Sequence, residues 1–321
     1  MPRYTRNVVV LAKVETTQGT DAVPVAGTDG ILLAGDFSVD PLNVTYAERN
    51  LMLPYFGGSQ SLIATVNARA SFSCELAGSG TAGTAAPWGP LLQGCATAQA
   101  SLTTPTRVEH TPVSTALKSL TLYIYDDGVL HKLIGAMGNA KLSAKIGETP
   151  KLMFEFLGSY SAVTAVALPS PTLTAWKVPL PMNKANVVDI TLGCTYSAGA
   201  ISGGTVFPST GIDIDLGNRT TFFTSLSAER ADLTDRSSTC SFDLELTAAQ
   251  EVTAMSDINS NTVTGLGFTI NGTAGNKIII FAPQLQRTAA RKVDRDGVRM
   301  IGFDGKLLPS AGNDEVRIVQ I

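Results

Sequence analysis

The chain has 321 residues, of which 44% are hydrophobic and 16% charged, and its formal net charge is −3. The length suits two domains of about 150 residues, and the charge excludes a global basic field that would recruit nucleic acid. The four cysteines form no CxxC pair, and with only two histidines a zinc site is hard to assemble, so we expect free thiols in a reducing compartment, no metal and no cofactor.

The N-terminal segment, residues 1–30, is expected to be extended. Its apolar run 8–12 ends at Lys13, which is too short for the about 7–15 apolar residues of a signal-peptide core. No stretch reaches the ~18 apolar residues of a membrane helix. We therefore expect no membrane insertion and folding in a cytoplasm.

Strands with one buried face are expected next. In residues 71–76, Phe72, Cys74 and Leu76 alternate with polar residues, and a period of two is typical of a half-buried strand. Residues 86–97 predict a short helix, although Gly89 and Pro90 weaken its first turn. The strands and the helix together favour an all-β domain over residues 31–167.

Turn signals divide the rest of the chain. Asp127-Gly128 follows an apolar run and predicts a tight hairpin, and Asn271-Gly272 and Asp296-Gly297 give the same signal later. The Pro-rich segment 168–185 interrupts regular structure and is expected to be a linker. Residues 245–256 predict the second helix, with Thr247 as its N-cap.

Residues 186–321 repeat the strand signals of the first half in the same order. The sequence separations between the first three pairs of matched segments are 175, 170 and 146 residues. The first half therefore carries about five additional residues in 41–70 and about 24 in 77–119. We therefore predict an all-β protein with one short helix per repeat and two tandem domains. The matched segments are Phe37–Asp40 with Ile212–Asp215, Ser71–Leu76 with Ser241–Leu246, Leu120–Ile124 with Leu266–Ile270, and Phe154–Phe156 with Ile301–Phe303.

One cofactor-type motif is present, the G-x-G-x-x-G of residues 78–83. Backbone N–H groups in such a loop can hold a dinucleotide pyrophosphate at a helix N-terminus. No acidic residue ends a parallel strand about 20 positions later, and the strand before the motif alternates instead of being continuously apolar. A connecting loop is therefore favoured over a dinucleotide site.

Charged residues form two sets. Acidic side chains project from the polar face of the predicted strands, which indicates either a solvated sheet face or a surface that repels nucleic acid. The only basic cluster lies in 287–299, where Asp294 and Asp296 dilute it; a salt-bridged turn or a subunit contact is favoured over a DNA site. The acidic candidates are Asp36, Asp40, Glu75, Asp213, Asp215, Asp243 and Glu245.

The segments Leu11–Ala22, Gly30–Leu32, Phe37–Pro41, Cys74–Gly83 and Pro87–Cys95 together give the chain a family likeness. It resembles the major tail tube proteins of long, non-contractile-tailed bacteriophages, most firmly over residues 8–100. The resemblance implies tail-tube-type β-sandwich or barrel domains with a flanking helix. Strands of neighbouring domains would join into a tube that conducts DNA without binding it specifically.

Two domains per chain then imply trimeric rings with pseudo-sixfold symmetry, with hexameric rings as the alternative. The partners would be further copies of the chain, the tape-measure protein and the tail-end proteins. A structural virion protein of the tail, assembled in the host cytoplasm and not an enzyme, is expected. Another β-rich phage component, such as a decoration, tail-tip or adhesin-like protein, is the alternative.

The resemblance also gives the charged and apolar candidates a place. The acidic residues would line the lumen, and a neighbour would order the N-terminal arm 1–30. The loop 46–62 would contact the next ring, because its exposed apolar stretch needs a covering partner. Its candidate residues are Glu48, Arg49, Leu51, Met52, Leu53, Tyr55 and Phe56.

Overall fold

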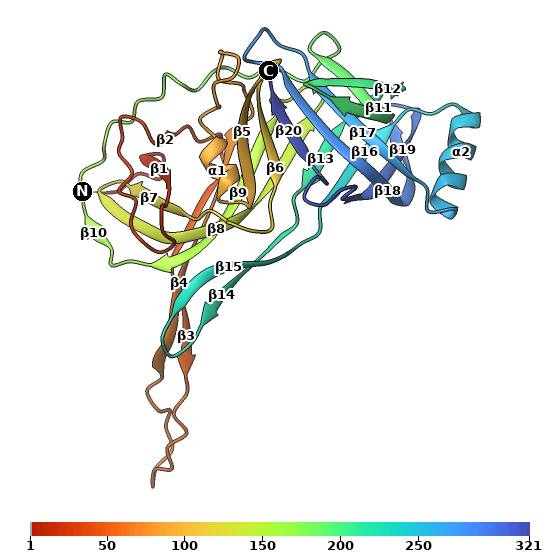
Figure 1. Ribbon diagram of the computed structural model, residues 1–321. Coiled ribbons are helices and arrows are strands. Elements are labelled where there is room, and N and C mark those ends of the chain that lie inside the picture. Colours follow the sequence, from red (N-terminus) through yellow and green to blue (C-terminus); the bar gives the residue numbers. More distant parts are fainter. Residues whose placement is uncertain (1) are drawn as a thin grey trace.

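The computed structural model describes residues 2–321, and antiparallel strands dominate it (Figure 1). The first half contains one five-residue helix, α1 (Gly89–Gln93). Its strands are β1 (Val8–Val14), β2 (Gly30–Ile31), β3 (Phe37–Ala47), β4 (Leu62–Glu75), β5 (Thr97–Thr103), β6 (Thr106–Pro112), β7 (Leu120–Asp126), β8 (Val129–Lys145), β9 (Lys151–Tyr160) and β10 (Thr164–Ala165).

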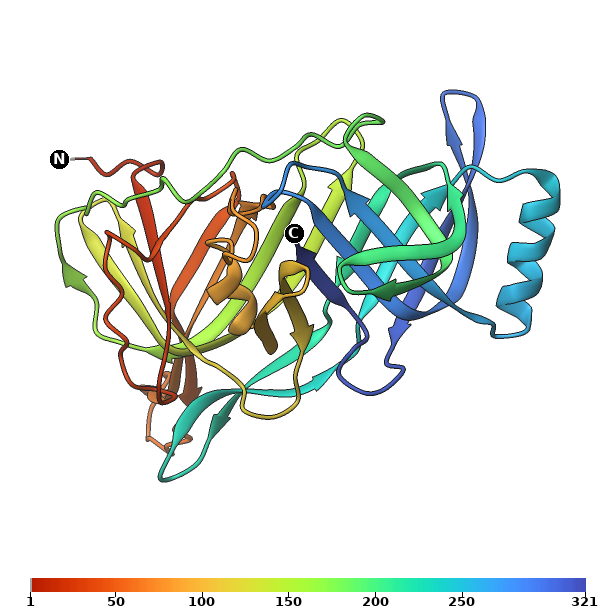
Figure 2. The ribbon, with the colours of Figure 1, turned by 45° about the horizontal axis from the view of Figure 1, so that its top comes forward.

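The second half contains the longer helix α2 (Ala248–Asn259), which lies at the end of the molecule farthest from the N-terminus (Figure 2). Its strands are β11 (Val187–Ser197), β12 (Ala200–Phe207), β13 (Ser209–Asp215), β14 (Asn218–Thr224), β15 (Glu229–Arg236), β16 (Thr239–Leu244), β17 (Val263–Ile270), β18 (Ile278–Arg295), β19 (Val298–Leu308) and β20 (Arg317–Gln320).

One continuous layer of eight strands runs through both halves, in the order β3–β4–β9–β8–β13–β16–β19–β18. The two halves meet within it at the β8–β13 ladder, where 141–145 pair with 211–215. Every pairing is antiparallel, so each strand alternates between a core side and an outer side. The layer therefore presents one polar face along its whole width.

A second layer covers the apolar side. In the first half it contains β2, β1, β7 and the start of β8. In the second half it contains β12, β11, β17, the start of β18 and β20, and the β5–β6 hairpin of the first half joins it by pairing with β20. The long strands β8 and β18 take part in both layers. One large cluster of buried hydrophobic residues lies between the two layers.

The same strand order occurs in each half, with matching registers in the eight-stranded layer. Phe37 lies opposite Phe72, which lies opposite Phe154; Ile212, Phe242 and Phe303 form the corresponding row. The ring centroids of Phe72 and Phe154 are 6.0 Å apart at 41°, and those of Phe242 and Phe303 are 5.8 Å apart at 38°.

This register corrects the fourth sequence match. Phe154 corresponds to Phe303, whereas the sequence alignment of 154–156 with 301–303 set it against Ile301. The alignment was wrong by two residues. A slip of two keeps every side chain on the same face, so apolar alternation alone does not detect it.

The expected N-terminal arm contains β1, whose seven residues pair with β7. Val10 and Leu11 are buried, and the carboxylate of Glu15 accepts hydrogen bonds from Gly135 N–H and Ser119 Oγ, both at 2.7 Å. Residues 8–15 are thus ordered by contacts within the chain.

Turns and helices follow the sequence signals unevenly. Asp127-Gly128 and Asp296-Gly297 form two-residue hairpins with positive φ, as expected. The Asn271-Gly272 prediction was wrong, because a longer loop, 271–277, joins β17 to β18. Helix α2 begins after Thr247 with a capping box to Gln250, whereas α1 is a single short turn.

The linker region 166–186 has no helix or strand and runs over the surface of the first half. Several hydrogen bonds hold it there; for example, Thr172 N–H donates to Ala26 O at 2.8 Å, and Trp176 Nε1 donates to Gly30 O at 2.9 Å.

Candidate assembly surfaces

The polar face of the eight-stranded layer carries most of the acidic candidates. Asp213 and Asp215 of β13 and Asp243 of β16 lie on it. Asp36 joins Asp213 and Asp215 along one groove of this face. Glu75 lies at the end of β4, and Glu245 is exposed just beyond β16.

Basic side chains neutralise this face, a feature that the sequence analysis missed. Lys145 Nζ lies 3.0 Å from Asp213, and Lys141 Nζ lies 3.6 Å from Asp215 and 3.5 Å from Glu155. The hydrogen bond and charge of Asp213 raise the pKa of Lys145 above its ordinary value. Acidic and basic side chains therefore alternate on this face, which is not uniformly acidic.

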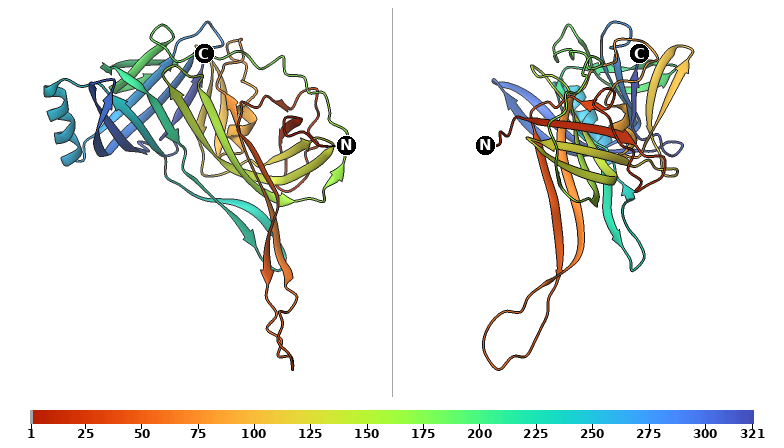
Figure 3. Two further views of the ribbon diagram at one scale, coloured as in Figure 1. Left: turned by 180° about the vertical axis from the view of Figure 1, so that it is seen from behind. Right: turned by 90° about the vertical axis from the view of Figure 1, so that its left-hand side faces the viewer.

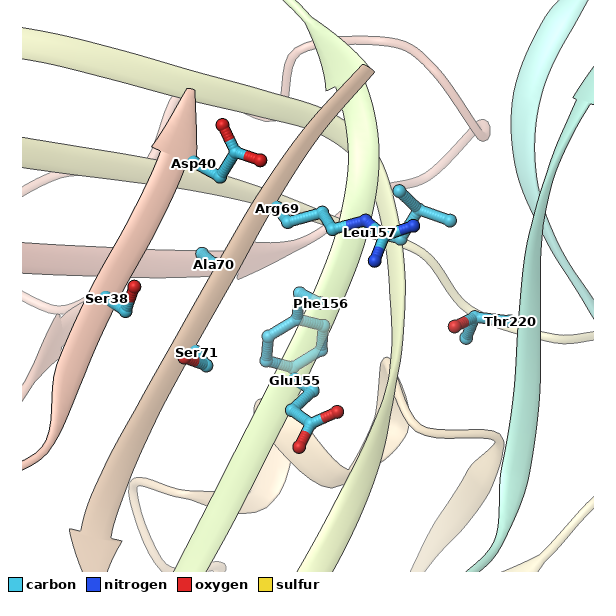
Figure 4. Close-up of a pocket in the computed structure, with 9 residues that line it drawn as sticks. All are labelled: Ser38, Asp40, Arg69, Ala70, Ser71, Glu155, Phe156, Leu157 and Thr220. Carbon is cyan, nitrogen blue, oxygen red and sulfur yellow. The ribbon is translucent and has the colours of Figure 1, made fainter. Parts of the chain in front are cut away.

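Asp40 occupies a separate shallow hollow at the β3 side of the layer (Figure 4). The guanidinium of Arg69 points toward Thr220 and Leu157, away from the Asp40 carboxylate. Among residues 2–321, the Asp40 side chain makes no ion pair within 4 Å. It is an exposed carboxylate at the edge of the sheet.

Both edges of the eight-stranded layer are open in the described chain. β3 pairs only with β4, and the 291–295 part of β18 pairs only with β19. An open edge offers unpaired N–H and C=O groups to another chain. A protein with two such edges is suited to joining copies side by side.

The loop expected to contact a neighbouring ring projects far from the body (Figure 3). It connects β3 to β4 and exposes large apolar side chains, with Met52 and Phe56 both fully exposed at 102% and 107%. Leu51, Leu53 and Tyr55 are also exposed. Glu48 lies at its base, where its carboxylate accepts a 2.7 Å hydrogen bond from Ser61 Oγ. Such a loop has few contacts of its own to bury its apolar groups.

The corresponding connection of the second half, between β13 and β16, is the β14–β15 hairpin. It packs against the first half, where Ala231 and Phe222 contact Met137 and Leu157. The connection that follows β3 in the first half therefore projects from the body, whereas the connection that follows β13 in the second half packs against the first half.

The glycine motif 78–83 is an internal contact. Gly78 N–H donates to Asn276 Oδ1 at 2.7 Å, and Gly80 N–H donates to Gly275 O at 3.1 Å. A Cβ on Gly78 would lie 2.0 Å from the Gly275 carbonyl oxygen. These N–H groups are therefore engaged by the 271–277 loop, which agrees with the connecting-loop interpretation.

A buried ion cluster adds a further link between the halves. Glu109 of β6 accepts hydrogen bonds from Arg107 Nε and Tyr196 OH, both at 2.6 Å, and from an Arg317 guanidinium nitrogen at 3.1 Å. Burial raises the pKa of Glu109, but the Tyr196 and Arg107 hydrogen bonds and the Arg317 charge outweigh it and leave that pKa below its ordinary value.

Within residues 2–321, no three His, Cys, Asp or Glu side chains come close enough together to hold a metal ion. The helices in that range are too short or too polar to cross a membrane.

Open sheet edges, a projecting apolar loop and an ion-paired polar face suit a structural protein that assembles with copies of itself. Residues 5–316 match the phage tail tube protein family. The chain therefore belongs to this family, whose members are structural and non-enzymatic, and it is a component of the virion tail that self-assembles into a tube. No curated protein matches the chain.

Proposed function

We propose that the chain is a two-domain subunit of a phage tail tube and that three chains form each ring with pseudo-sixfold symmetry. The two units are residues 31–167, together with β1, and 186–321, joined by the linker 168–185. The observation that carries this proposal is the repeated strand order with matching registers, joined at the β8–β13 ladder. The tail would be of the long, non-contractile type, which electron micrographs lacking a contractile sheath would support.

Eight strands per chain suit a large closed barrel. Three chains would supply 3 × 8 = 24 strands to it. Barrels of 16–18 strands already enclose an aqueous channel, so this one would have a wide lumen. An averaged electron-microscopy view down the tube axis, combined with the mass per ring, tests the count: six chains per ring would overturn it.

The ion-paired face would line the lumen. DNA phosphates passing along it would meet carboxylates beside lysines, and two of these lysines, Lys141 and Lys145, are already ion-paired, which weakens their attraction for the phosphates. Reversing the charges of Asp213, Asp215, Asp243 and Glu245 would remove the ion-pair partner of Lys145 and one of two partners each of Lys141 and Arg291, and would make the face basic toward DNA. We expect tubes that form but eject DNA poorly; normal infectivity would contradict the lumen assignment.

The projecting loop would stack one ring on the next. Deleting residues 48–58 should leave rings that do not form long tubes, because the apolar contact surface is lost. A matched variant keeps the loop length but replaces Met52 and Phe56 with serine. It distinguishes the effect of losing the apolar side chains from the effect of shortening the loop. Intact long tubes from both variants would refute this role.

A further inference from the structure

The β8–β13 junction inside the chain provides a template for the junction between chains, an inference that rests on the proposed ring. Its two strands have counterparts at the two open edges. β18 in the second half corresponds to β8, and β3 in the first half corresponds to β13. Joining β18 of one copy to β3 of the next would repeat the same contact.

The registers fix which residues would meet. Ala140 lies opposite Phe154 and Ala290 lies opposite Phe303, so Lys141 corresponds to Arg291. In the other pair of strands, Phe37 opposite Phe72 matches Ile212 opposite Phe242, so Asp40 corresponds to Asp215. Lys141 and Asp215 are direct partners in the β8–β13 ladder.

The charges agree with this register. Lys141 is shared between Glu155 of its own half, at 3.5 Å, and Asp215 of the other half, at 3.6 Å. Arg291 corresponds to Lys141 and pairs with Asp304, the counterpart of Glu155, at 2.9 Å. It also lies 3.5 Å from Asp243 of its own half, and its side chain remains 51% exposed. The position matching Asp215 is the exposed Asp40 of another copy.

Apolar side chains near both open edges are also left partly uncovered. At the internal junction, Leu92 of α1 and Ile214 of β13 line one small apolar space. The counterpart of Ile214 is Val39, which is only partly buried at the open β3 edge. Beside the other open edge, Val252 of α2 is 71% exposed and Met255 is 37% exposed.

We propose that β18 of one copy pairs antiparallel with β3 of the next, with Arg291 opposite Asp40 and Arg295 opposite Asp36. The second pair follows from the same register, because Lys145 lies opposite Gly211 in the internal ladder. The partner is a second copy of this chain, held by backbone hydrogen bonds and by ion pairs that set the register.

Cysteine cross-linking tests the register in the full chain. Asp40→Cys combined with Arg291→Cys places two thiols at directly opposed positions, where Cβ atoms are about 4.5–5.5 Å apart, within reach of a disulfide after a small adjustment. Within one chain the two positions lie at opposite edges of eight strands. All four native cysteines are buried, so they should not compete.

The matched control is Ser38→Cys combined with Arg291→Cys, which moves one thiol by two residues on the same face. After mild oxidation, denaturing gels without reductant should show a ladder that ends at the number of chains in one ring. We expect at least tenfold less cross-linked product in the control. Equal or stronger cross-linking in the control would overturn the register while leaving the tube itself in place.

A charge exchange covers the case in which the cysteine variants do not assemble. Arg291→Asp sets two carboxylates against each other, so the critical concentration for assembly should rise about tenfold. Adding Asp40→Arg should restore it several-fold, and adding Ser38→Arg in place of Asp40→Arg should not. Failure of Asp40→Arg to restore assembly, with wild-type rings present, overturns the ion pair. An absence of wild-type rings would instead refute the proposed function.

Discussion

Replacing Glu109 with glutamine should weaken the contact between the halves markedly. The side chain is 8% exposed, and its partner Arg107 is 11% exposed. Removing one member of a buried ion pair costs about 3–5 kcal/mol, because the other charge stays buried without compensation. Arg317 is 29% exposed and can recover water, and glutamine still accepts one hydrogen bond. We therefore expect a loss of about 2–3 kcal/mol.

The assay is urea or thermal unfolding of the unassembled chain at pH 7. With an unfolding entropy of about 2.1 cal/mol/K per residue, a chain of 321 residues shifts by about 1.5 °C per kcal/mol, so the transition should fall by about 3–5 °C. Asp126→Asn is the matched control, since the Arg3–Asp126 pair is exposed, at 49% and 33%. Exposed pairs contribute about 0–1 kcal/mol.

The pH dependence gives an independent check. The pKa of Glu109 is lowered in the folded chain, so its contribution is complete above the unfolded carboxyl pKa of about 4.3 and is lost as the pH falls through the folded value. The difference between wild type and Glu109→Gln should therefore shrink in acid. A difference below about 0.5 kcal/mol at pH 7, or one that is unchanged at low pH, would refute the reasoning.

Three further outcomes are expected. Gly78→Ala should lower the unfolding midpoint, because its Cβ would lie 2.0 Å from Gly275 O. Gly57→Ala is the control and should leave the midpoint unchanged, because its Cβ would have no atom within 4 Å. Equal effects of the two substitutions would contradict the close approach at Gly78. Thr247→Ala should destabilise by about 1 kcal/mol through loss of the capping box, and amide exchange in the first turn of α2 should accelerate. Burial raises the pKa of the native thiols, so a thiol reagent at pH 8 should label the folded chain only on the time scale of unfolding.

Local patterns were enough to predict the β class and the side of each matched strand that faces the core. Phe72 and Phe242 occupy the buried rows that their alternation indicated. Alternation repeats every two residues and does not set the pairing of distant strands, so the match of Phe154 slipped. The Asn271-Gly272 signal failed because the loop is fixed by its contact with Gly78, almost 200 residues earlier in the chain.

For the acidic candidates, too, the local sequence predicted the position on a strand but not the contacts with distant strands. Their positions on the polar face follow from local alternation in β13 and β16. Their cationic neighbours Lys141 and Lys145 come from β8, which reaches Asp213 and Asp215 only through the junction of the halves. Charge counted strand by strand therefore overstated the acidity of this surface.

The linker makes one kind of sheet junction intramolecular. A tether of this kind holds two strands at an effective concentration in the millimolar range, so β8 and β13 can pair at any dilution of the protein. The open edges at β3 and β18 have no such tether and must meet by diffusion. In the proposed ring, each chain would enter assembly with one junction already complete, and dilution should release chains in which β8 and β13 remain paired.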